Sequence, residues 1–147
     1  MKDWKNRLGG QSWLDKSEQK LVEDFISKLL GTTEPPGDLR IHKYITDLKE
    51  GHESTKQSLS VMIHDLASLK QAVEKINRTT KYASATKKDV KKILARLYSF
   101  FHNKEPSLKY ASPELRRVVE HKMEDKRKEA LDTINWDEVH EMLLYCD

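Results

Sequence analysis

Apolar side chains recur at intervals of three and four residues through most of this chain, and this period constrains the fold more than any other feature of the sequence. A spacing near 3.6 places such residues on one face of an α-helix, whereas a half-buried strand needs strict alternation. No segment of the chain alternates in that way. We therefore expect an all-α fold: a four-helix bundle followed by two further helices.

The composition is typical of amphipathic helices with wide solvent-facing sides. Of the 147 residues, 37% are hydrophobic and 35% are charged. The single cysteine, Cys146, excludes an intramolecular disulfide, and no apolar run has the length of a membrane span or the pattern of a signal peptide. We therefore expect a cytoplasmic protein with no membrane partner.

Capping residues and glycines mark the boundaries of the first two predicted helices. Asp15 opens the first helix with the spacing of a capping box, and Gly31 follows its last apolar residue. Asp38 opens a short second helix that ends at Gly51. The residues before Asp15 have no clear period, and we predict that 1–14 form an N-terminal arm.

A third helix is predicted from Ser54 to about Asn77. Its apolar residues are Leu59, Met62, Leu66, Leu69, Val73 and Ile76. These spacings of three and four form a heptad seam of only about two and a half repeats, which is shorter than a coiled coil usually needs and favours a long core helix. The alternative is a protein-interaction module in which the Leu59–Ile76 seam pairs with a helix of another chain.

The fourth predicted helix, from Thr86 to about His102, combines an apolar stripe with a basic side. The stripe consists of Val90, Ile93, Leu94, Leu97 and Phe101. A rotation of about 100° per residue puts the opposite side at Lys88, Lys91, Lys92, Ala95 and Ser99. We expect this side to be exposed, and its small residues would let the helix approach a nucleic-acid groove closely.

Basic residues are concentrated in and around the fourth helix. Residues 81–104 carry seven basic side chains against one acidic side chain, Asp89, so their local charge is +6 in a chain whose net charge is +3. An exposed lysine face is often only solvated, but the acids that usually form i, i+4 pairs are nearly absent here. The helix also begins at Thr86, where backbone N–H groups favour an anion such as phosphate. This pattern predicts binding to nucleic acid.

Sequence motifs for catalysis and metal binding are absent. The six histidines include no i, i+4 pair and, with one cysteine, give no zinc spacing. There is no Gly-rich phosphate loop, no G-x-S-x-G and no kinase signature. We therefore expect no cofactor, no metal, no small-molecule substrate and no enzyme activity from this chain alone.

The order of the elements and several short runs resemble the N-terminal core-binding (SAM-like) domain of tyrosine recombinases, the phage-integrase family, and particularly its archaeal branch. These runs are RIHKY at 40–44, SATKKDVKKIL at 84–94 and LYSFF at 97–101. The run TINWDEV at 133–139 resembles the entry into the family's catalytic domain. The resemblance covers about residues 17–147.

In that family the N-terminal domain clamps duplex DNA, while the C-terminal domain supplies an Arg, a His-x-x-Arg motif and a nucleophilic Tyr. None of the six histidines here begins a His-x-x-Arg motif, so no tyrosine is expected to be a nucleophile. The resemblance implies double-stranded DNA binding by a fragment of a mobile-element integrase, and it admits further recombinase protomers as partners. The DNA-binding bundle would span 15–104, and 105–147 would hold a linker helix and the start of a truncated catalytic domain.

The predicted contacts with DNA come from the second and fourth helices. Lysines that meet phosphates position a protein on DNA and carry little sequence information. The expected DNA-binding residues are Arg40, Lys43, Thr86, Lys87, Lys88, Lys91, Lys92 and Arg96.

Overall fold

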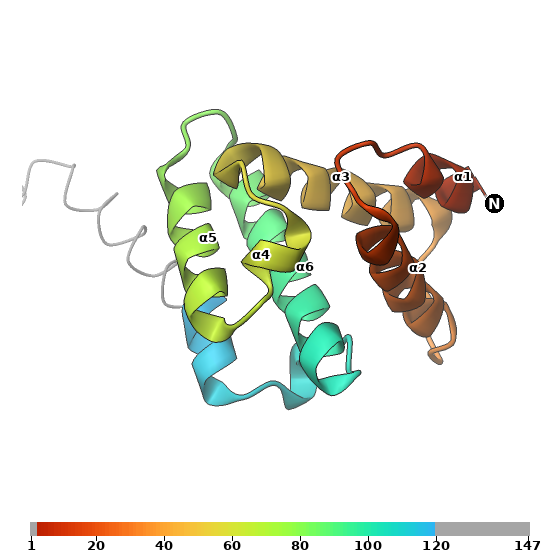
Figure 1. Cartoon of the computed structure of the whole chain (residues 1–147). Coiled ribbons are helices and arrows are strands. Elements are labelled where there is room, and N and C mark those ends of the chain that lie inside the picture. The colour runs from red at the N-terminus through yellow and green to blue at the C-terminus, as the bar shows by residue number, and fades with distance from the viewer. Residues whose placement is uncertain (1–2, 120–147) are drawn as a thin grey trace, which may run out of the picture.

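The computed structural model describes residues 3–119, and all regular elements in this part of the chain are helical (Figure 1). The expected all-α class is confirmed. The elements are α1 (Asp3–Gly9), α2 (Lys16–Leu30), α3 (Asp38–Thr55), α4 (Leu59–Met62), α5 (Leu66–Arg78), α6 (Ser84–Asn103), the 3-10 turn η1 (Leu108–Tyr110) and a helix that begins at residue 113. The predictions for residues 120–147, including the last helix, lie outside the described residues.

Helix α2 begins and ends where the sequence predicts. The Asp15 side chain accepts a hydrogen bond from the Glu18 backbone N–H at 2.7 Å, and the Glu18 carboxylate accepts one from the Asp15 N–H at 3.0 Å. Gly31 follows the helix as its C-cap. Glu18 is 3% exposed, and its second oxygen also accepts from the N–H and the hydroxyl of Ser60 at 2.9 Å. The capping carboxylate therefore also ties α4 to α2.

The N-terminal residues form part of the core, and the prediction of an arm is wrong for the described residues. Trp4 and Leu8 of α1 are buried, as is Leu14 in the following turn. Arg7 donates to the carbonyl oxygen of His42 at 2.8 Å and so joins α1 to α3. The two buried side chains of α1 lie only one turn apart. Two positions are too few to reveal a helical period in the sequence.

Helix α3 continues beyond Gly51, where the sequence predicted its end. Gly51 is buried, and a Cβ at this position would lie 3.2 Å from the side chains of Leu94 and Val90 on α6. The glycine thus permits a close approach of two helices instead of ending one. The helix ends at Thr55, and Lys56 caps it in a left-handed conformation with φ of 57°.

The predicted continuous helix from Ser54 to Asn77 is wrong. The chain breaks after α3 and again after α4, and Asp65 caps α5 by accepting from the Ser68 N–H at 2.7 Å. Five members of the expected seam are fully buried in the chain's own core: Leu59, Met62, Leu69, Val73 and Ile76. A continuous seam open to a helix of another chain therefore does not exist in this fold.

Helix α6 lies at the centre of the fold and packs against α2, α3 and α5. Its predicted stripe is buried at Val90, Ile93, Leu94 and Leu97. At the end of the stripe, Phe100 is 7% exposed and Phe101 is 45% exposed, so the expectation for Phe101 is wrong.

The opposite side of α6 is only partly exposed, contrary to the prediction. Lys91, Ala95 and Ser99 are 1%, 0% and 2% exposed, whereas Lys88 and Lys92 are exposed as expected. Lys87, beside this side, is 6% exposed. Helix α5 covers this side: Lys87 Nζ donates to the backbone oxygen of Asn77 at 3.1 Å, and Lys91 Nζ donates to Asn77 Oδ1 at 2.7 Å. The small residues of α6 therefore serve close packing inside the bundle.

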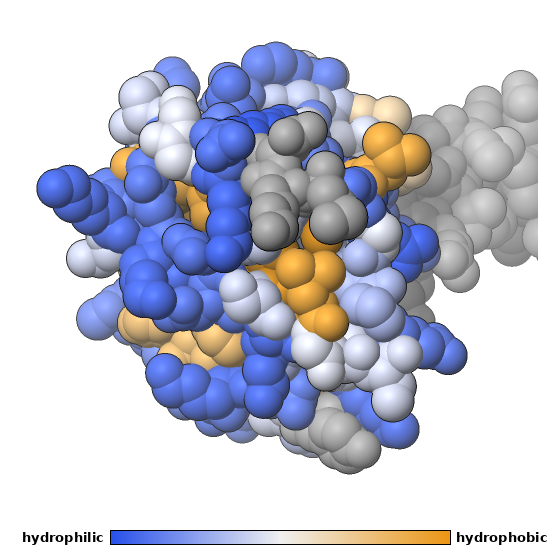
Figure 2. All heavy atoms as spheres, turned by 90° about the vertical axis from the view of Figure 1, so that its right-hand side faces the viewer, coloured by the Kyte–Doolittle hydropathy of each residue, from blue (hydrophilic) through white to orange (hydrophobic). Residues whose placement is uncertain are grey.

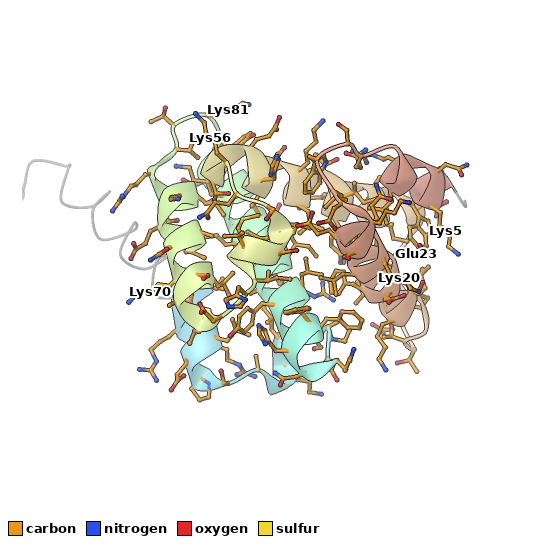
Figure 3. All side chains as sticks on the ribbon, in the orientation of Figure 1. Lys5, Lys20, Glu23, Lys56, Lys70 and Lys81 are labelled. Atoms are coloured by element: carbon orange, nitrogen blue, oxygen red, sulfur yellow. The ribbon has the colours of Figure 1, made fainter. Side chains whose placement is uncertain are left out.

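The outer surface carries mostly charged side chains. Lys5, Lys20 and Glu23 extend from α1 and α2, and Lys70 extends from α5 (Figure 3). The end of the molecule formed by α1 and α2 is mainly hydrophilic, with separate small apolar areas (Figure 2). Among residues 3–119, no helix has the length and apolar character needed to cross a membrane.

Candidate nucleic-acid interface

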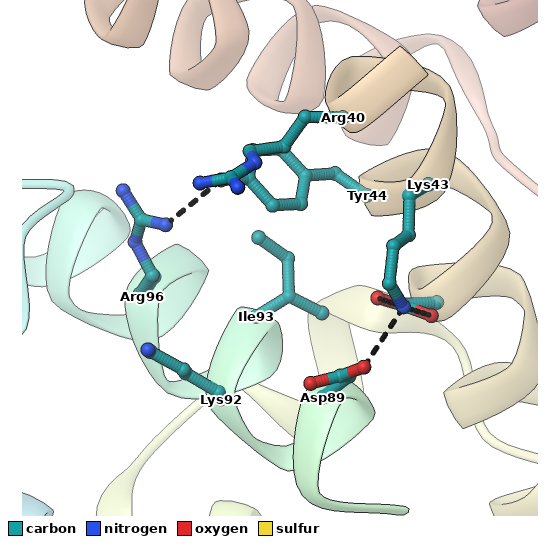
Figure 4. A pocket seen from close by; sticks show the side chains of 8 residues that line it. Arg40, Lys43, Tyr44, Asp89, Lys92, Ile93 and Arg96 are labelled. Carbon is teal, nitrogen blue, oxygen red and sulfur yellow. Dashed lines mark hydrogen bonds and ion pairs between the residues drawn. The ribbon is translucent and has the colours of Figure 1, made fainter. Parts of the chain in front are cut away.

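A hollow of about 270 Å³ lies between α3 and α6 and brings together four of the eight predicted DNA-binding residues (Figure 4). Its lining consists of Arg40, Lys43, Tyr44 and Asp47 from α3, and of Asp89, Lys92, Ile93 and Arg96 from α6. Four cations face two carboxylates, which gives a formal excess of two positive charges. We call this site the cationic hollow. It exists because residues three and four apart share one side of each helix.

Lys43 is engaged inside the cationic hollow. Its Nζ lies 3.2 Å from Asp47 Oδ2 and 2.9 Å from Asp89 Oδ2, so it bridges a carboxylate of α3 and one of α6. The hydrogen bond to Asp89 raises the pKa of Lys43 above its ordinary value. Burial raises the pKa of Asp47, whose side chain is 5% exposed. Lys43 therefore joins the two helices. The two carboxylates compensate its positive charge, so we expect it to attract a phosphate only weakly.

Arg96 is fixed by two hydrogen bonds to residues outside α6. Its Nε donates to the carbonyl oxygen of Pro106 at 2.9 Å, and one terminal nitrogen donates to the Tyr44 hydroxyl at 3.1 Å. Its guanidinium carbon lies 5.5 Å from the centre of the Tyr44 ring. Arg96 thus joins α3 to the turn after α6 and stands in a defined position beside the hollow.

Of the four predicted residues that do not line the cationic hollow, only Lys88 is exposed, and Lys87 and Lys91 are buried. Lys88 and Lys92 are exposed and, being four residues apart, share one side of the helix with Arg96. Arg40 is exposed on α3, across the hollow. Thr86 is half-buried, and α6 begins at Ser84 without a side-chain cap, so the predicted start at Thr86 is wrong. We call Arg40, Lys88, Lys92 and Arg96 the basic surface.

A second hollow, of about 540 Å³, adjoins the first and shares Arg40, Tyr44 and Arg96 with it. The rest of its lining is Leu29, Thr32, Glu34, Pro35, Pro36 and Gly37 around the end of α2, and Glu105, Pro106 and Ser107 after α6. Its two arginines face two glutamates, so its formal charge is balanced. We call it the neutral hollow.

Sequence reasoning missed Tyr44 and Asp47 as parts of the site. Tyr44 lines both hollows, and Asp47 lines the cationic hollow. Their spacing from Arg40 of four and seven residues puts all three on one side of a helix, which is a signal that could have found them.

Among residues 3–119, no three His, Cys, Asp or Glu side chains are grouped so that they could hold a metal ion. Comparisons of the chain with models of protein families, with curated proteins and with solved structures gave no match.

Proposed function

We propose that this chain binds double-stranded DNA through the basic surface, as the DNA-clamping N-terminal part of a tyrosine recombinase. The single observation that carries the proposal is that exposed Arg40 and Lys92 line one hollow, with exposed Lys88 one turn before Lys92 on α6. These residues are about fifty positions apart in the sequence and come from two helices that pack against each other. Helices α2, α3, α5 and α6 would be the four helices of the core-binding bundle.

The basic surface suits a phosphate backbone because three of its four cations, Arg40, Lys88 and Lys92, are exposed. Binding to a duplex releases condensed counterions, which supplies most of the sequence-independent affinity. Arg96 would attract the phosphates through its positive charge more than by a direct hydrogen bond, because two of its nitrogens already have acceptors. Contacts of this kind fix the register of a protein on DNA without reading bases.

The set of proposed contacts is smaller than the sequence suggested. Lys87 and Lys91 are buried against α5, and Lys43 is paired with two carboxylates. Moving any of these side chains to a phosphate would break hydrogen bonds within the bundle. We therefore assign them a structural role and assign DNA contact to Arg40, Lys88 and Lys92.

The proposal is tested by duplex binding at low salt with matched charge variants. Arg40→Gln combined with Lys92→Gln removes one charge from each helix, whereas Lys20→Gln combined with Lys70→Gln removes two charges that line neither hollow. The first pair should weaken binding at least tenfold, and the second should leave it within about twofold. Equal losses, or a wild-type chain that binds no duplex at low salt, would refute the proposal.

A further inference from the structure

The neutral hollow has the size and chemistry of a site for a nucleobase. We propose that it receives one unpaired base of a DNA strand whose phosphate lies in the adjoining cationic hollow. The inference rests on the proposed duplex binding and adds a preference for DNA that carries an unpaired nucleotide. The volume of about 540 Å³ lies within the range of about 300–1,000 Å³ found for ligand pockets.

The wall shared by the two hollows consists of groups on which bases stack. Tyr44 offers an aromatic ring, and Arg96 offers a planar guanidinium 5.5 Å from the centre of that ring. Arg96 is held by the Pro106 carbonyl and the Tyr44 hydroxyl. The wall is therefore in position before a ligand arrives, and little conformational entropy is lost when a base packs against it.

The charges around the two hollows favour different parts of a nucleotide: the phosphate in one and the base in the other. All four cations line the cationic hollow, and two of them, Arg40 and Arg96, also line the neutral hollow, so a phosphate is favoured on the side of Lys92, away from the two glutamates. In the neutral hollow, Glu34 and Glu105 offset Arg40 and Arg96, so a phosphate gains little there. Carboxylates accept hydrogen bonds from the exocyclic amine of cytosine, which makes an unpaired cytosine a suitable occupant.

Two glycine variants provide a matched test. Gly37 lines the neutral hollow, has an ordinary φ of −76°, and would place a Cβ in open space. Gly37→Trp should therefore fill the hollow without disturbing the fold. Gly9 on α1 also has open space at its Cβ and lines neither hollow, so Gly9→Trp is the control. Thermal unfolding of both variants checks that the fold is intact.

The probes are a continuous duplex and the same duplex with one unpaired cytosine. The wild-type chain and Gly9→Trp should bind the second about tenfold more tightly, because stacking of one base on an aromatic ring has an effect of this order. Gly37→Trp should bind the continuous duplex as the wild type does and lose the preference. Millimolar cytidine monophosphate should not displace the probe with the unpaired cytosine, because it lacks the neighbouring phosphates.

Equal wild-type affinities for the two probes would overturn the inference while leaving the proposed function intact, and so would a preference that survives Gly37→Trp. Displacement by cytidine monophosphate would instead assign the hollow to a free nucleotide. Failure of the wild-type chain to bind either probe at low salt would refute the proposed function itself.

Discussion

Lys91 Nζ donates a hydrogen bond to Asn77 Oδ1 at 2.7 Å, so a lysine that the sequence suggests for DNA contact joins α6 to α5 inside the bundle. Lys91 is 1% exposed. A buried ammonium group needs hydrogen-bond acceptors because its removal from water is costly. The geometry therefore predicts that changes at this pair affect folding and not DNA binding.

Asn77→Ala should lower the free energy of unfolding by about 1.5–3 kcal/mol, the usual worth of a hydrogen bond to a charged group. Urea unfolding measures this change, and duplex binding of the folded variant should equal that of the wild type. A variant with unchanged stability and weakened DNA binding would contradict the structural role of Lys91.

Gly51→Val should destabilise the bundle by about 1–3 kcal/mol, because even a Cβ at this position would lie 3.2 Å from Val90 and Leu94. Gly9→Ala is the control, since a Cβ there meets open space at the end of α1. Thermal unfolding compares the two variants. Equal unfolding temperatures for both would show that α3 and α6 are not in close contact at Gly51.

Local signals explain which parts of the fold the sequence could predict. The start of α2 depends on Asp15 and Glu18, which are three residues apart, and the buried stripe of α6 depends on a period within one helix. The burial of Lys91 depends on α5 covering a second side of α6, and no local pattern reports that. The break at Asp65 was visible as a capping residue, but the heptad spacing across it concealed the signal.

The sequence could predict which charged residues form the candidate site, but not which residues they bond to. Arg40, Lys92 and Arg96 were expected at the interface, and the packing of α3 on α6 brings them around one hollow. The bond from Arg96 to Pro106 and the bridge from Lys43 to Asp89 join separate elements, so they follow only from the tertiary arrangement.

Asp47→Asn should strengthen duplex binding several-fold, because it removes one of the two negative charges of the cationic hollow. The substitution should also change how stability depends on pH. Burial raises the pKa of Asp47 in the folded state, so the ionised carboxylate weakens the fold above that pKa. This penalty declines as the pH falls through the raised value.

The contribution of Asp47 to stability should therefore increase from neutral to mildly acidic pH in the wild type and be absent in Asp47→Asn. Unfolding by urea at several pH values measures the difference between the two proteins. A difference that does not vary with pH, or weaker DNA binding by the variant, would show that Asp47 does not act as a buried negative charge at this site.

Tyr44→Phe should loosen the turn after α6, because Arg96 loses one of its two acceptors in this wall. Loss of a hydrogen bond from a charged donor costs about 1.5–3 kcal/mol. Amide hydrogen exchange at Glu105, Ser107 and Leu108 should accelerate, while exchange within α2 stays the same. Unchanged exchange in the turn would mean that Arg96 does not hold it.

The central claim is that exposed cations of α3 and α6 meet the phosphates of a duplex, and the salt dependence of binding tests it most directly. Each phosphate-contacting cation removed should reduce the slope of log K against log salt by about one unit. Arg40→Gln, Lys88→Gln and Lys92→Gln together should therefore reduce the slope by about three. The control variant Lys5→Gln, Lys20→Gln and Lys70→Gln should leave the slope nearly unchanged. Equal slopes for the two triple variants would contradict the claim.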